Sequence, residues 1–335
     1  MTFFRIPSRA LGPKALPLVI GALTFALVWA GRSPPGPWGL DFDYFWTAGR
    51  AVWQGGDPYR AVDAAIREGT LRWPFFYPGT AAILLAPFGA LPHQLSAALF
   101  TSLGMGLLVW SVHGWRRWIV LSPPALEALL IGQWSPWLTA AVGIPWLGFI
   151  WAAKPSIGVA LFAGWPSRAA VYGGLAVVIL SFVLLPHWPT MWLDAVQSSG
   201  QYRAPVQRLG GFVLLLAWLR WRKPEARLLG VLSLIPHTTS VYELLPLFLV
   251  PQTKRSFSVL LGLSFVATTI VYVRYPFGGS LSATLDARWP YLLILVYLPA
   301  LLMVLRSTPP VGSAAIPEES RDILPRDGET EAAPN

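Results

Sequence analysis

Apolar stretches recur along almost the whole chain, and short segments that carry most of the charged residues separate them. The hydrocarbon core of a bilayer is about 30 Å thick, so a helix that crosses it needs roughly 20 apolar residues. The pattern predicts an all-α polytopic membrane protein. The stretches that we interpret as helices at membrane depth are residues 16–30, 77–91, 94–112, 118–131, 137–152, 156–164, 169–185, 210–219, 228–250, 256–273 and 290–305.

Several of these stretches are too short to cross a bilayer alone, and prolines interrupt many of them. Broken helices at membrane depth are stable only where protein or water covers the freed backbone groups. We therefore expect short or re-entrant helices around a cavity, in a bundle of about 10 transmembrane helices within a range of about 8 to 12. The expected breaks are at Pro87, Pro123–Pro124, Pro145, Pro155 and Pro236.

The basic residues predict which segments lie on which side of the membrane. Arg5, Arg9 and Lys14 precede the first span, so we expect an uncleaved signal anchor with the N-terminus in the cytoplasm. The pattern leaves the crossing parity between residues 77 and 167 open. The predicted segments are a membrane domain (1–306), two outer loops (31–76 and about 186–209) and a disordered, acidic cytoplasmic tail (307–335).

The first outer loop is polar and acidic where the flanking sequence is apolar. Of the ten Asp and Glu residues outside the tail, five lie in residues 31–74. Phe42, Phe45, Trp46 and Trp53 fall at helical spacings, which predicts a helix lying flat at the membrane interface at about 42–53. Asp41 would be the N-cap of this helix. A turn sequence at 55–58 would end it.

Composition narrows the class of protein further. Hydrophobic residues make up 54% of the 335 residues and charged residues 12%, and the mean hydropathy is +0.52. Soluble domains carry about 25% charged residues. The net charge of +9 lies in short clusters between the spans, which favours topology signals and lipid contacts over nucleic-acid binding. Without Cys, and with four scattered His residues, the sequence has no spacing typical of a metal site.

Two consecutive segments resemble a known family. The segment DFDYFWTAGRAVWQGGDPY (41–59), followed by FFYPGTAAILLAPFGALP (75–92), is similar to the opening signature of family-87 glycosyltransferases. Weaker marks of that family follow in the same order at Gly132–Gln133, Lys154–Pro155, Pro236–His237 and Tyr242–Glu243. The chain departs from the family at Gly79, where a second Pro is usual, and between residues 133 and 154, where a basic turn is expected.

The resemblance implies a GT-C-type membrane enzyme with its active site on the outer face of the cell membrane. Such an enzyme transfers a hexose, here mannose, from a polyprenyl-phosphate carrier to a glycolipid or glycan acceptor, with inversion at the anomeric carbon. Carried over to this sequence, Asp41 is the general base, and Asp43 is the fallback. We expect no cofactor. A divalent cation held by Asp41 and Asp43 with the phosphate is the alternative to a metal-free site.

Other polar residues that interrupt apolar sequence are candidates for substrate binding. Lys154 and His237 would stabilise charge on the leaving phosphate, and Glu243 would pair with His237. The simpler readings are a snorkelling side chain for Lys154, a hydrogen-bonded interior histidine for His237, and hydrogen bonds between helices for Tyr77 and Gln133. The remaining candidates are Tyr77 and Gln133 for sugar hydroxyls, Tyr242 beside Glu243, and Arg203 and Arg208 for phosphate or as solvated loop charges.

Two further readings remain open from the sequence. Broken helices with polar residues at membrane depth also suit a transporter or flippase for a lipid-linked molecule. A noncatalytic member of an envelope-synthesis complex would keep the fold and lose the reaction. The long acidic outer loop favours the enzyme, because transport does not require such a loop. The expected partners are thus the donor, the acceptor and the bilayer, and not nucleic acid.

Overall fold

In the computed structural model, residues 15–31, 40–198, 203–238, 240–276 and 281–307 are described, and every element among them is helical. The α-helices are α1 (Ala15–Gly31), α2 (Leu40–Trp53), α3 (Pro58–Arg67), α4 (Gly79–Gly89), α5 (His93–Ser111), α6 (Pro123–Ile131), α7 (Ser135–Gly143), α8 (Pro155–Gly164), α9 (Arg168–Leu184), α10 (Trp188–Ser198), α11 (Pro224–Leu234), α12 (Lys254–Arg274), α13 (Leu281–Leu292) and α14 (Leu298–Arg306). The 3₁₀ helices are η1 (Gly114–Leu121), η2 (Pro145–Ala153), η3 (Pro205–Gln207), η4 (Gly211–Arg220) and η5 (Val241–Leu249), and a π turn, η6 (Leu293–Tyr297), joins α13 to α14.

Prolines set many of the helix boundaries, as the sequence predicts. Pro123, Pro145 and Pro155 each stand at the first position of a helix, where the missing N–H group costs nothing. Pro236 lies in the break between α11 and η5. The expected break at Pro87 is wrong, because Pro87 lies inside α4, which ends two residues later at Gly89.

The described residues contain three helices that are long and apolar enough to cross a bilayer: His93–Ser111, Lys254–Arg274 and Ala283–Arg306. A fourth span results if α9 and α10, which meet at a 97° bend, count as one. The predicted number of about ten is therefore not confirmed. Predicted spans such as 118–131, 137–152 and 228–250 are each divided between two short helices.

Apolar side chains cover much of the outer surface of the long helices, as in a helical membrane protein. On α12, Phe265 and Val273 are exposed, and on α9 Leu175 and Ile179 are exposed. In water such a surface would be unfavourable, whereas lipid tails solvate it. The composition and the surface thus agree on a helical membrane protein. The sidedness of its loops stays a prediction.

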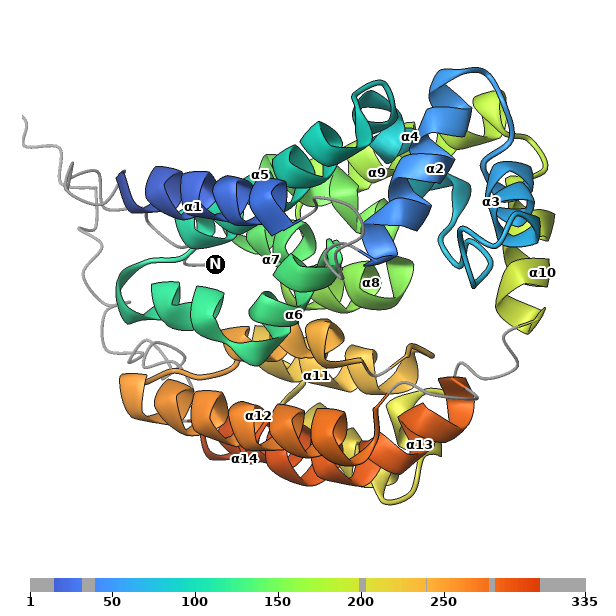
Figure 1. Ribbon diagram of the computed structural model, residues 1–335. Helices are drawn as coiled ribbons and strands as arrows, with labels where there is room; N and C mark the ends of the chain where they lie inside the picture. Colours follow the sequence, from blue (N-terminus) through green and yellow to red (C-terminus); the bar gives the residue numbers. More distant parts are fainter. Residues whose placement is uncertain (1–14, 32–39, 199–202, 239, 277–280, 308–335) are drawn as a thin grey trace, which may run out of the picture. The chain divides into compact units, whose positions relative to one another are not determined.

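Helices α2 and α4 pack closely because glycines face the contact (Figure 1). A Cβ atom on Gly49 would lie 2.5 Å from the carbonyl oxygen of Leu85, and one on Gly89 would lie 2.2 Å from the backbone nitrogen of Arg50. Real side chains do not approach so closely, so both positions need glycine. Helix α10 in turn contacts α3 and α4, so segments far apart in the sequence gather around α2.

Helix α2 covers the segment for which the sequence predicts an interfacial helix. It begins at Leu40, so Asp41 lies within the first turn, and the expectation that Asp41 is the N-cap is wrong. After Trp53 the chain turns at Gly55, which has φ +75°. Asp57 then caps α3 by accepting hydrogen bonds from the backbone nitrogens of Tyr59 (2.8 Å) and Arg60 (3.1 Å). Except for Ser307, the predicted tail lies outside the described residues.

Candidate functional site

Asp41 is held in place by the apolar face of α2. Phe42 and Phe45 lie about one turn apart on α2, and both side chains are fully buried. The ring of Phe42 packs 5.2 Å from that of Phe100, and the ring of Phe45 packs 4.8 Å from that of Tyr77. The amphipathic spacing that predicts the helix therefore also fixes the position of the carboxylate. Asp41 is partly exposed as a residue, while its carboxyl group is largely shielded from solvent.

Gln133 joins Asp41 to Tyr77. Its side-chain amide nitrogen donates a short hydrogen bond to Oδ2 of Asp41, and its Oε1 accepts one from the Tyr77 hydroxyl at 3.1 Å. The preceding residue, Gly132, ends α6 in the left-handed conformation, with φ +73°. A Cβ atom there would lie 2.7 Å from Cβ of Phe42, so only glycine lets this turn lie against α2.

Lys154 lies on the other side of Tyr77, between η2 and α8. It is 8% exposed, and its Nζ atom is 2.7 Å from Oε1 of Glu243 and 3.1 Å from the hydroxyl of Tyr242. The same nitrogen lies 4.4 Å from the ring centre of Tyr242 and 5.5 Å from that of Tyr77. A buried ammonium requires such partners, because burial of an unpaired charge is very unfavourable.

We call the residues linked in this way, namely Asp41, Gln133, Tyr77, Lys154, Tyr242 and Glu243, the polar network. They come from segments more than 200 residues apart in the chain and meet where α6 contacts both α2 and η5. The network brings together six of the ten candidate residues that the sequence singles out.

Electrostatics distinguish Asp41 from an ordinary surface acid. Burial of its carboxyl group raises the pKa of Asp41 above the usual value, and the hydrogen bond from Gln133 and the positive charge of Lys154 oppose that rise. A carboxylate with a raised pKa is a stronger base than a solvated one. The arrangement therefore suits the acceptance of a proton from a weak acid such as a hydroxyl group.

A further acid, Glu127 on α6, lies in the same region as the polar network. It is 8% exposed, accepts a hydrogen bond from the backbone nitrogen of Tyr242 at 2.5 Å, and accepts a second one from the hydroxyl of Tyr272. Glu127 thus anchors the start of η5, which carries Tyr242 and Glu243. The sequence marks Glu127 only as an acid that interrupts an apolar stretch, and the fold is needed to reveal the partners of Glu127.

The predicted pair between His237 and Glu243 is not formed. His237 is buried, with Nδ1 2.8 Å from the carbonyl oxygen of Ile235 and Nε2 3.1 Å from the hydroxyl of Tyr297. Glu243 pairs with Lys154 instead. Packing brings the ammonium group within 2.7 Å of the carboxylate, and its charge strengthens that contact. His237 thus borders the polar network without a direct hydrogen bond to it.

Asp43 and Arg203 also lie apart from the polar network. Asp43 is 2.8 Å from Nε2 of His93, with both side chains about a third exposed. Arg203 lies 3.8 Å from Asp286, which Arg208 also contacts at 2.5 Å. Asp43 thus joins α2 to α5, and Asp286 joins α13 to the segment around η3. Within the described residues, no three His, Asp or Glu side chains gather as ligands for a metal ion.

Comparison with known proteins gives one match. The chain is 31% identical over 179 residues to a polyprenol-phosphate-mannose-dependent alpha-(1-2)-phosphatidylinositol mannoside mannosyltransferase of Mycolicibacterium smegmatis. The aligned region covers 52% of this chain and 38% of that enzyme, so the chain spans well under half the length of this relative. No family model matches the chain. No solved structure matches it either. The chain is thus similar to a mannosyltransferase that uses a polyprenyl-linked sugar.

Proposed function

We propose that the protein is an inverting glycosyltransferase of the GT-C class, in family 87. It would move mannose from a polyprenyl-phosphate carrier to a cell-envelope glycolipid or glycan acceptor at the outer face of the membrane. The similarity to the mycobacterial enzyme supports the reaction class. The observation that carries the proposal is the polar network, which joins an acid on α2 to a buried lysine.

Each residue of the network has a role in the proposed reaction. The carboxylate of Asp41 accepts the proton of the acceptor hydroxyl while that oxygen bonds to the anomeric carbon. The bond from that carbon to the phosphate oxygen breaks on the opposite face, and the phosphate leaves with the electron pair, so the configuration inverts. Gln133 orients the carboxylate through its hydrogen bond.

Lys154 suits the stabilisation of the leaving phosphate. An ammonium group has three N–H donors, and Glu243 and Tyr242 accept from two of them. The third donor remains for a phosphate oxygen, on which negative charge grows as the bond breaks. Tyr77 and Tyr242 bracket this ammonium with their rings and bear hydroxyl groups suited to sugar binding.

A transfer assay on the purified protein tests the proposal. The protein is incubated with radiolabelled polyprenyl-phosphate mannose and a membrane lipid extract, and the products are separated by thin-layer chromatography. We expect a labelled product that contains the transferred mannose. No labelled product should form when a nucleotide-linked mannose replaces the polyprenyl-phosphate mannose as donor. The same mixture in proteoliposomes detects movement of the carrier across the bilayer. Movement without product would favour the flippase, and neither result would favour a noncatalytic role.

A further inference from the structure

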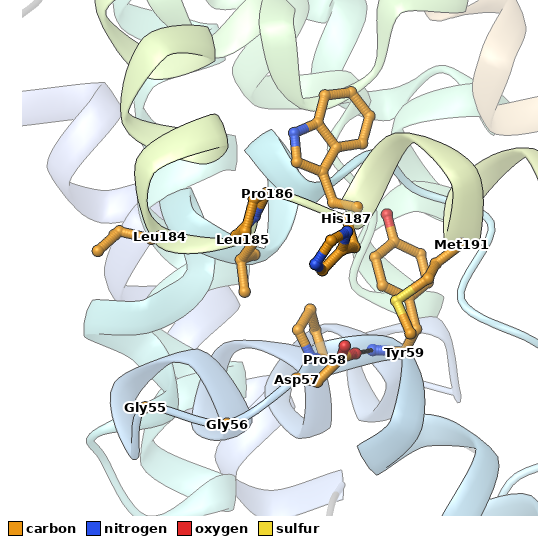
Figure 2. Close-up of a pocket in the computed structure, with 11 residues that line it drawn as sticks. Gly55, Gly56, Asp57, Pro58, Tyr59, Leu184, Leu185, Pro186, His187 and Met191 are labelled. Carbon is orange, nitrogen blue, oxygen red and sulfur yellow. Dashed lines mark hydrogen bonds between the residues drawn. The ribbon is translucent and has the colours of Figure 1, made fainter.

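A cavity of about 170 Å³ opens between two turns of the chain (Figure 2). One wall is the turn from α2 to α3, at residues 55–59, and the other is the 97° bend between α9 and α10, at residues 184–191. In Figure 2, His187 faces Asp57 and Pro58 across the opening. The two walls come from the two segments that the sequence assigns to the outer face.

The lining combines hydrogen-bonding groups with apolar surface. Asp57 uses Oδ1 for both backbone bonds of the α3 cap, so Oδ2 is available as an acceptor. His187 is exposed and presents its imidazole. Pro58, Pro186 and Met191 supply flat or flexible apolar surface. None of the described lining residues is Lys or Arg, and one is an acid, so the cavity disfavours anionic ligands such as phosphates.

A series of hydrogen bonds connects the wall of this cavity to Asp41. The hydroxyl of Tyr59, a lining residue, donates to the backbone oxygen of Tyr77 at 2.8 Å. The hydroxyl of Tyr77 donates to Gln133, which donates to Asp41. Tyr77 is therefore held by its backbone oxygen to the cavity wall and by its hydroxyl group, through Gln133, to the candidate base.

We propose that this cavity binds a neutral hexose unit of the acceptor, one that does not itself react. Hexoses combine hydroxyl groups, which match Asp57 and His187, with apolar C–H faces, which match the prolines and Met191. The reacting sugar must lie at Asp41, so the cavity receives a unit further along the acceptor glycan. This inference rests on the proposed function, because it identifies the acceptor of that reaction as a glycan of more than one unit.

Acceptor length provides the test. The protein is assayed with radiolabelled polyprenyl-phosphate mannose and either octyl α-mannoside or octyl α-mannotrioside as acceptor. In His187→Ala we expect KM for the trioside to rise on the order of two- to tenfold, as for loss of one hydrogen bond. KM for the monosaccharide should not change. Met191→Trp, which fills the cavity, should raise KM for the trioside as well.

Controls separate this inference from the proposed function. Asp194→Asn, at an exposed position of α10 outside the cavity, should leave both KM values unchanged. Equal changes for both acceptors in His187→Ala and Met191→Trp would mean a structural role and would overturn the inference. Equilibrium binding of radiolabelled mannotriose to the purified protein is measured in parallel. Binding that both variants weaken supports the site even if no transfer occurs, and absence of binding in the wild type overturns it.

Discussion

Replacing Lys154 with methionine leaves Glu243 buried without its partner. Glu243 is 1% exposed, and the distance from its Oε1 to Nζ of Lys154 is 2.7 Å. Removing one partner of a buried pair typically costs about 3–5 kcal/mol, because the remaining charge has neither water nor a counterion. We therefore expect Lys154→Met to lower the free energy of unfolding by about that amount.

The double variant Lys154→Met/Glu243→Leu separates this effect from a loss of packing. Replacing both members of a buried pair with apolar side chains is often neutral or stabilising. We expect the double variant to recover most of the stability that Lys154→Met loses, as measured by far-UV circular dichroism during titration with sodium dodecyl sulfate. A double variant that loses as much as the two single variants together would refute the reasoning, since it would show no coupling between the two side chains.

Two further predictions concern the base and the α2–α4 contact. Asp41 acts as a base only when ionised, and the hydrogen bond from Gln133 lowers its pKa. Gln133→Ala should therefore move the acidic limb of the pH profile of kcat/KM to higher pH. An unmoved limb would argue against Asp41 as the general base. Gly49→Ala should destabilise the fold by about 1–3 kcal/mol, because the new Cβ atom would collide with Leu85. The control Gly174→Ala, where a Cβ atom meets nothing within 4 Å, should leave the stability unchanged. Thermal unfolding measures both effects.

Local features of the fold follow well from the sequence. Apolar runs identify helices such as α1 and α5, and prolines such as Pro123 and Pro155 mark helix starts because their missing N–H group costs nothing there. Pro87 does not break the helix: its missing N–H removes a single backbone hydrogen bond, and α4 continues past it to Gly89. The predicted number of spans is not confirmed, because hydropathy does not distinguish one long helix from two short ones at an angle.

The candidate site depends on contacts that a sequence does not encode locally. Gln133 and Asp41 are 92 positions apart, and Lys154 and Tyr242 are 88 apart. Their polarity within apolar sequence marks them as candidates, but the choice of partners depends on packing. For this reason Glu243 pairs with Lys154 and not with the nearby His237, and Arg203 pairs with Asp286 at a distance from the network.

The role of Asp41 is tested most directly by transfer with Asp41→Asn, compared with Asp63→Asn at an exposed position of α3. The amide has nearly the same shape but accepts no proton, so we expect the rate of mannose transfer to fall by about 10²- to 10⁴-fold. Binding of the polyprenyl-phosphate donor and the helical circular dichroism spectrum should persist, and Asp63→Asn should transfer at the wild-type rate. Transfer by purified Asp41→Asn at the rate of Asp63→Asn would contradict the assignment of Asp41 as the base.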